Sequence, residues 1–374
     1  MSLVGRDEQI DEWMASLQRI EDGLDSRPMA LYGLRGAGKT VLLMKLNDLA
    51  LHNDWITAFV EATSGKSLRE QLSSAFESRL YDIAKPSAGQ KVLNALKTAL
   101  SFSATVSEAP ALTFGIDLSK ASGSNASTGS FSGDLERYVR DLSDASGELG
   151  AGVAILIDEA QDLSGGDMAA LVGLAQAVAV RRMRVAIALT GLPTLPRLLA
   201  EAKSYAERLF AYQEIGNLGT PEALEALLGP AQSRGVSWTD AAAARVVRAA
   251  DGYPYFLQEY GSACWLQADE PPIGVSDVRK AEGLAGQRLD AGFFRSRWER
   301  ATEAEKRYLQ AMAEDEDGPS RTAELAARLR SSQSSLSSLR SRLIQKGMIY
   351  APEAGAVTFT VPLFARFIKR QVVQ

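Results

Sequence analysis

The stretch that decides the fold is Gly33-Leu34-Arg35-Gly36-Ala37-Gly38-Lys39-Thr40. A short apolar run, 29–32, precedes it, and an amphipathic run with leucines at helical spacing, 41–51, follows it. Strand, glycine-rich loop and helix in this order are the context of a phosphate-binding loop, in which backbone N–H groups and the N-terminus of the helix bind an anion. We expect Lys39 to reach the β- and γ-phosphates of a nucleotide and the Thr40 hydroxyl to bind Mg²⁺.

A second motif lies about 120 residues further along the chain. The run 153–157 is continuously apolar, as in buried parallel strands, and it ends in Asp158-Glu159. At the carboxyl end of a central strand, Asp158 can hold Mg²⁺ through water, and Glu159 can act as the general base that activates the attacking water. Together the two motifs predict a Mg²⁺-dependent nucleotide hydrolase.

Other apolar runs complete a parallel sheet. The run 185–189 predicts another buried strand, and Thr190 follows it at the strand end, beside the Asp158 strand. We therefore expect Thr190 to contact the γ-phosphate or the water. Further strands are predicted at 55–60 and 212–218, with helices between them, including one over 193–210. This alternation predicts an α/β sandwich with a parallel sheet.

Composition excludes several classes of protein. The net charge is −5, 46% of the residues are hydrophobic and 23% are charged, as in soluble globular proteins. A single cysteine, Cys264, excludes an internal disulfide, and a single histidine, His52, makes histidine-based metal sites improbable. Cys264 lies in an apolar helical run and is expected to be a buried thiol. Without an 18-residue apolar run or an N-terminal signal region, we expect a cytoplasmic protein with no membrane partner.

The stretch 101–133 is rich in Ser, Ala, Thr and Gly and has almost no charge. Its runs 102–106 and 112–118 alternate apolar and polar residues, which predicts a β-hairpin inserted between core strands. A helix is expected before it, over 88–100. Both a partner-binding hairpin and a surface loop without a binding role are consistent with this composition.

From Thr220 onward the pattern is helical, and it ends in three helices and a two-stranded wing, which predicts a winged helix-turn-helix. We divide the chain into an ATPase core (1–218), a helical lid (219–290) and a winged helix domain (291–374). The segment 319–374 has nine basic and two acidic residues. Such a basic end suits either a polyanion-binding surface or a solvated basic face.

These motifs resemble those of AAA+ ATPases of the initiator and origin-recognition type and of the related STAND-like ATPases. The resemblance implies ATP and Mg²⁺ as cofactors, assembly into a homo-oligomer with ATP, Thr190 as sensor 1, and Arg208 as an arginine finger. Arg208 can instead pair locally with Glu207 or Glu201. In this resemblance Val4 and Arg6 contact adenine, and Pro254 belongs to the glycine–proline motif of the lid. The expected cofactor-binding residues are Val4, Arg6, Gly33, Leu34, Arg35, Gly36, Ala37, Gly38, Lys39, Thr40, Val41 and Pro254.

Two positions differ from the initiator pattern. The lid reads Gly252-Tyr253-Pro254 where initiators usually carry an arginine, and sensor 1 is a threonine where asparagine is commoner. Both differences predict slow hydrolysis, as in a nucleotide-dependent switch.

Two functions follow from this reading. In the first, the winged helix binds DNA through contacts that are independent of base sequence, made by Ser334, Ser335, Arg340 and Arg342. In the second, the chain is a STAND-like signalling or defence ATPase, and its winged helix binds a partner protein.

Overall fold

The computed structural model describes residues 3–63, 65–83, 130–148 and 150–372. The predicted helix 88–100 and nearly all of the predicted insertion 101–133 lie outside the described residues. The contacts of the chain group into two compact units. We name them the sheet unit, Arg6–Tyr32 with Lys39–Glu214, and the helical unit, Met1–Gly5 and Gly33–Gly38 with Ile215–Gln374.

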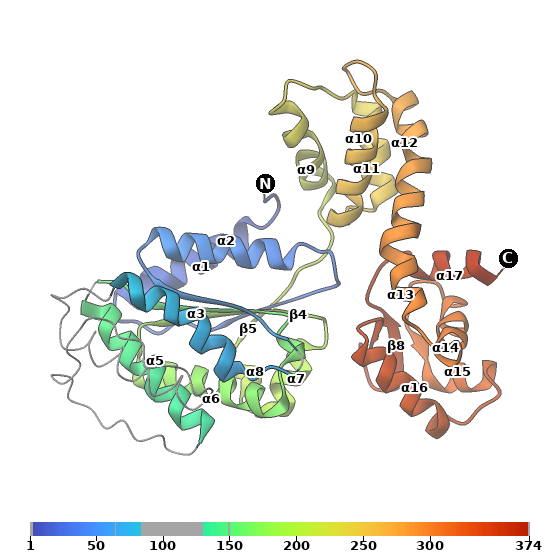
Figure 1. The fold of residues 1–374 in the computed structure, drawn as a ribbon. Helices are drawn as coiled ribbons and strands as arrows, with labels where there is room; N and C mark the ends of the chain where they lie inside the picture. The colour runs from blue at the N-terminus through green and yellow to red at the C-terminus, as the bar shows by residue number, and fades with distance from the viewer. Residues whose placement is uncertain (1–2, 64, 84–129, 149, 373–374) are drawn as a thin grey trace. The chain divides into compact units, whose positions relative to one another are not determined.

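Five parallel strands form the centre of the sheet unit, in the order β2-β3-β4-β1-β5 (Figure 1). Every residue of β3 and β4 is buried, as expected for central strands that helices cover on both faces. Because all neighbouring pairs are parallel, the carboxyl ends of the strands meet at one edge of the sheet and the amino ends at the other. The strands are β1 (Met29–Tyr32), β2 (Ile56–Glu61), β3 (Val153–Asp158), β4 (Val185–Gly191) and β5 (Ala211–Glu214).

Helices cover both faces of this sheet, with α1 and α2 on one face and α5 to α8 on the other (Figure 1). The predicted α/β sandwich with a parallel sheet is therefore confirmed. The helices are α1 (Asp7–Glu21), α2 (Lys39–His52), α3 (Leu68–Ile83), α5 (Phe131–Glu148), α6 (Gly165–Arg181), α7 (Leu195–Ala202) and α8 (Ala206–Leu209), with the short 3₁₀ helix η2 (Ala160–Asp162).

The region 193–210 differs from the single helix that its periodicity predicts. Lys203 has an extended backbone, with φ −152° and ψ 124°, and separates α7 from α8. This break allows both Ala206 and Phe210 to be fully buried in the core of the sheet unit. The predicted last strand, 212–218, is also shorter, because β5 ends at Glu214.

In its described residues the helical unit consists of nine α-helices, one π-helical turn and a small antiparallel sheet of order β6-β8-β7. The segment α14 to β8 contains three helices and a hairpin, in the order that the sequence predicts for a winged helix. The elements are α9 (Thr220–Gln232), α10 (Asp240–Ala250), α11 (Pro254–Gln267), α12 (Val275–Arg288), η3 (Leu289–Phe294), α13 (Arg295–Glu299), α14 (Glu303–Ala313), β6 (Ser320–Arg321), α15 (Thr322–Arg328), α16 (Gln333–Gln345), β7 (Ile349–Tyr350), β8 (Ala356–Phe359) and α17 (Phe364–Val372).

One buried apolar cluster joins the first and last helices of this unit, from Ala223 to Ile368. Aromatic rings form the connection: Phe294 stacks on Phe364 and Phe367, with ring centroids 5.9 and 5.4 Å apart. Cys264 belongs to the same cluster, and burial raises the pKa of its thiol to about 12. The expected buried thiol is confirmed, and no helix in the described ranges is long and apolar enough to cross a membrane.

A buried carboxylate holds α14 to α16. Glu305 is fully buried, accepts hydrogen bonds from the Thr302 N–H (2.8 Å) and Lys346 Nζ (2.6 Å), and pairs with Arg342 (3.3 Å). Burial alone would raise its pKa, but the hydrogen bonds from Lys346 and Thr302 lower the pKa to about 2. The ionised form is therefore kept at every physiological pH, and the contact is lost only as the pH falls toward 2.

Candidate functional site

The loop Gly33–Gly38 leaves the carboxyl end of β1, and Lys39 is the first residue of α2. β1 lies between β4 and β5, so this helix follows an interior strand of the sheet. Gly36 and Gly38 have φ of +86° and +90°, a region that glycine adopts without strain. The strand, loop and helix thus have the geometry that the sequence predicts for a phosphate-binding loop.

The loop glycines also permit close approach of other groups in the helical unit. A Cβ at Gly36 would lie 2.6 Å from the Tyr253 hydroxyl oxygen. Tyr253 is 1% exposed, and this hydroxyl finds no hydrogen-bond partner within the described residues. Burial raises its pKa, so it remains a protonated donor. Burial and the charge of Arg35 lower the pKa of Arg297, which places two cations near the same loop. An anionic ligand would accept a hydrogen bond from the Tyr253 hydroxyl, and the positive charges of the two arginines would attract it.

In this region Pro254 was predicted from the sequence as a site residue, and Tyr253 was not. Pro254 is the first residue of α11, and Tyr253 is the residue that caps the same helix. No sequence pattern indicates that Tyr253 lies near a loop glycine more than 200 residues earlier.

The carboxyl ends of β3 and β4 bring Asp158 and Thr190 together. Both are buried, at 3% and 0% exposed, and the Thr190 hydroxyl donates a hydrogen bond to Asp158 Oδ1. The same oxygen accepts the Glu159 N–H at 2.9 Å. The predicted proximity of the β3 acid and the β4 threonine is thus present in the structure.

Glu159 lies directly after β3 with φ +50°, a left-handed conformation that is uncommon for a residue with a side chain. The Gln161 amide donates to Glu159 Oε2 at 2.5 Å, while Gln161 Oε1 accepts the Leu192 N–H at 3.0 Å. Gln161 therefore ties Glu159 to the segment that follows β4. No role for Gln161 was predicted from the sequence, although Gln161 lies two residues after Glu159.

The chemistry of these residues fits a divalent cation. Both hydrogen bonds to Asp158 end on Oδ1, so Oδ2 accepts none from the described residues and can hold a metal-bound water. Thr40 is exposed in the first turn of α2 and offers a hydroxyl oxygen, a hard ligand that suits Mg²⁺. Lys39, beside it, is 5% exposed.

The remaining predicted residues lie in different surroundings. Arg6 precedes α1 at 8% exposed, and burial lowers its pKa. Val4 and Val41 are half-buried. Arg208 is exposed in α8 and makes no ion pair with any described residue, whereas Glu201 pairs with Arg197 at 3.2 Å. The local pairing of Arg208 with Glu201 is therefore not present.

The predicted DNA-contacting residues all belong to α16. Ser334 and Ser335 are exposed in its first turn, and Arg340 is half-buried. Arg342 is half-exposed and pairs with Glu305. Of the nine basic residues in 319–374, six form ion pairs within the helical unit; Arg330, Arg340 and Arg366 form none with described residues.

Comparison with known protein families finds a match for the first half of the chain. A model described as "AAA ATPase domain" matches residues 2–187, which contain both nucleotide motifs. Residues 2–187 are therefore similar to the AAA ATPase domain family. A second model, described as "Domain of unknown function (DUF8462)", matches residues 291–368, C-terminal to the AAA ATPase domain. The predicted AAA+ resemblance is confirmed for the ATPase domain. No curated protein matches the chain.

The chain is also similar to solved structures, among them the following three. The RuvB Holliday junction branch migration motor of Thermotoga maritima is 16% identical, with a TM-score of 0.46 over 95% of this chain and 92% of that one. Orc1 of Aeropyrum pernix in complex with DNA is 14% identical, with a TM-score of 0.45 over 99% and 94%. Cdc6p of Pyrobaculum aerophilum is 14% identical, with a TM-score of 0.45 over 99% and 95%.

Proposed function

We propose that this chain is an AAA+ ATPase of the initiator or origin-recognition type, which binds ATP with Mg²⁺, hydrolyses it slowly and acts as a nucleotide-dependent switch on DNA. The observation that carries this proposal is the set of hydrogen bonds at the carboxyl ends of β3 and β4, from Thr190 to Asp158 and from Gln161 to Glu159. One carboxylate is buried where it can hold the metal, and the other is held where it can take a proton from water.

The hydrogen bonds at the carboxyl ends of β3 and β4 give a physical reason for slow ATP hydrolysis. A threonine hydroxyl has a single O–H donor, and Thr190 donates it to Asp158. The same proton cannot also be donated to the γ-phosphate or orient the attacking water. Hydrolysis therefore requires a rearrangement at Thr190, which suits a switch that stays in its ATP-bound state for a long time.

The switch would move the lid and the C-terminal helices together. They share the apolar cluster that includes Phe294, Phe364 and Phe367, and interior packing of this kind resists sliding. A nucleotide-driven movement of α9 to α12 would therefore carry α14 to α17 with it.

DNA binding is proposed for the surface of α16. We expect replacement of both Arg340 and Arg342 with alanine to weaken duplex binding by the full chain. If both contact phosphates, the dependence of log Kd on log salt falls by up to about two units. Fluorescence anisotropy with a labelled duplex at several salt concentrations, with ATP and with ADP, measures this.

Two further variants separate DNA contact from folding, because Arg342 also pairs with Glu305. Ser334→Glu places an acid in the first turn of α16, where the helix dipole favours it, but repels phosphates. Arg279→Ala removes an exposed arginine of α12 and serves as the matched control. Unchanged affinity in the Ser334 and arginine variants would exclude α16 as the DNA contact.

The alternative, a STAND-like signalling or defence ATPase, is favoured by one observation. Ion pairs within the helical unit engage most of the basic residues of 319–374, which reduces the positive charge available to DNA. In that case the winged helix domain binds a partner protein. Absence of duplex binding by the wild-type chain at low salt, with either nucleotide, would select this alternative.

Assembly into a homo-oligomer rests on Arg208. Its guanidinium is exposed without an ion pair to described residues, so it can be offered to the nucleotide of a neighbouring copy. We expect Arg208→Ala to leave the ATP affinity unchanged and to remove only the part of the specific ATPase activity that rises with protein concentration. Arg197→Ala, in α7, is the matched control. A wild-type specific activity that is independent of concentration would exclude a finger acting between copies.

A further inference from the structure

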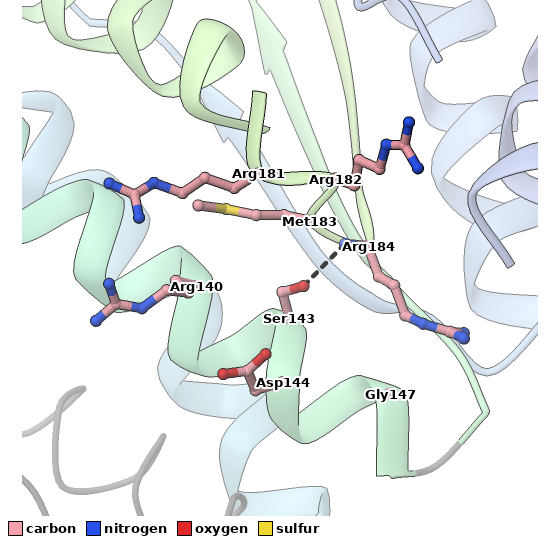
Figure 2. Close-up of a pocket in the computed structure, with 8 residues that line it drawn as sticks. All are labelled: Arg140, Ser143, Asp144, Gly147, Arg181, Arg182, Met183 and Arg184. Atoms are coloured by element: carbon pink, nitrogen blue, oxygen red, sulfur yellow. Dashed lines mark hydrogen bonds between the residues drawn. The ribbon is translucent and has the colours of Figure 1, made fainter. Parts of the chain in front are cut away.

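A hollow of about 470 Å³ lies in the sheet unit, between α5 and the turn that joins α6 to β4 (Figure 2). Its charged lining consists of four arginines, Arg140, Arg181, Arg182 and Arg184, and one acid, Asp144. The turn leads into the first residue of β4, so the hollow lies at the amino edge of the sheet. The residues Asp158, Glu159 and Thr190 lie at the carboxyl edge, so the two sets of residues are separate.

The turn that carries Arg182 and Arg184 is held in place by hydrogen bonds. The Arg184 N–H donates to the hydroxyl of Ser143, a buried residue of α5, at 2.8 Å (Figure 2). The Arg184 carbonyl accepts the N–H of Val153, the first residue of β3, at 2.8 Å. Gly147 lies under the Arg184 side chain, where an added Cβ would be 3.5 Å from Arg184 Cδ. Arg184 is therefore positioned by α5 and β3 before any ligand arrives.

Positive charge in this hollow is only partly compensated. Arg181 pairs with Glu136 at 2.9 Å, and Arg140 lies 3.7 Å from Asp141. Arg182 and Arg184 form no ion pair within the part of the chain that the structure describes. A chain with a net charge of −5 thus concentrates cations at one place on its surface.

Arg182 occupies a position that favours glycine. It ends α6 in the left-handed conformation, with φ +50° and ψ 48°, and its N–H bonds to the Val178 carbonyl. Glycine is the usual residue at such a cap because a Cβ is strained there. The helix dipole favours a cation at this end of α6, but it gives no reason for arginines at 140 and 184. Arg182 therefore stands at a strained backbone position, beside other arginines.

The arrangement of the guanidinium groups indicates the class of ligand. Arg140 and Arg181 extend to one side of the hollow, and Arg182 and Arg184 to the other (Figure 2). The four groups are spread over both sides of the hollow and do not converge on one point, as donors to a single compact anion would (Figure 2). A strip of arginines matches a row of phosphates, which guanidinium groups bind in a fork. Among the described residues that line the hollow none is aromatic, so base stacking, on which single-strand binding relies, has no partner among them.

We propose that this strip, Arg140, Arg181, Arg182 and Arg184, is a binding site for the phosphate backbone of duplex DNA. It reads no base sequence, and it is a second contact in addition to the one proposed for α16. The inference stands on the sheet unit alone and does not require the winged helix to bind DNA.

The test uses the full chain, a labelled DNA duplex and fluorescence anisotropy at several salt concentrations. We expect the double variant R182A/R184A to bind about 10-fold more weakly and to lower the salt dependence of log Kd by up to about two units. Arg197→Ala, an exposed arginine of the same unit that follows the carboxyl end of β4, should bind as the wild type does. A single-stranded oligonucleotide should bind more weakly than the duplex.

Arg182→Gly distinguishes a binding role from a structural one. Glycine relieves the strain at φ +50°, so the midpoint of thermal unfolding should be unchanged or higher, while duplex binding weakens. Unchanged affinity and salt dependence in R182A/R184A would overturn the proposal, as would stronger competition by poly-glutamate than by unlabelled duplex, which would indicate an acidic protein segment as the ligand. If only the α16 variants weaken binding, this inference fails and the proposed function stands. If the wild type binds no duplex, both fail.

Discussion

Lys39→Ala weakens ATP binding by about 100-fold or more, which corresponds to about 3 kcal/mol. Lys39 is 5% exposed at the start of α2, directly after the loop glycines, so little water can replace its ammonium group beside the phosphates. Isothermal titration calorimetry of the full chain with Mg²⁺ and ATP measures the loss.

Lys45→Ala is the matched control, since Lys45 is an exposed lysine of the same helix. We expect it to bind ATP with wild-type affinity. Lys39→Arg keeps the charge but changes its shape, and should recover only part of the binding, because a planar guanidinium cannot occupy the place of a compact ammonium. Wild-type affinity in Lys39→Ala would remove the phosphate-binding role of this loop.

Glu159→Gln lowers the rate of ATP hydrolysis by at least about 100-fold and leaves ATP binding intact. The amide oxygen of the new glutamine still accepts the hydrogen bond from Gln161, so the geometry after β3 is kept and only the base is lost. Single-turnover assays with radiolabelled ATP should show that bound ATP persists, and light scattering should show that any ATP-dependent assembly is longer-lived.

Gln161→Ala makes a useful comparison, because it retains the base but removes its attachment to the Leu192 N–H. We expect a smaller reduction of kcat than in Glu159→Gln, with an unchanged affinity for ATP. If Glu159→Gln turns over at the wild-type rate, another group takes the proton and the assignment of Glu159 is wrong.

The elements whose structure depends on neighbouring residues, the phosphate-binding loop and the buried strands, could be predicted from the sequence. The stretch from Gly33 to Thr40 contains the glycines that its turn requires, and a helix follows that turn. The run 153–157 is apolar enough for a strand that is buried on both faces of the sheet. Residues at the ends of such strands, Asp158 and Thr190, could be placed at one edge by parallel topology alone.

Contacts that depend on packing over long sequence separations were not predictable. Gln161 matters because Glu159 adopts φ +50° and because the segment after β4 offers an N–H, and neither fact is visible in a single sequence. The same holds for the Tyr253 hydroxyl near Gly36 and for the arginine strip, whose members 140, 181, 182 and 184 line one hollow only because α5 packs beside α6. The break at Lys203 was missed because apolar periodicity continues across it.

The parallel sheet has a consequence for how the chain can respond to two ligands at once. Its carboxyl edge carries Asp158 and Thr190, and its amino edge carries Arg184, at opposite ends of the buried strands β3 and β4. Two ligands bound there do not compete for space, so any influence between them is a coupling free energy transmitted through the strands. Such coupling is reciprocal: if occupancy of the arginine strip tightens ATP binding by some factor, ATP tightens binding at the strip by the same factor.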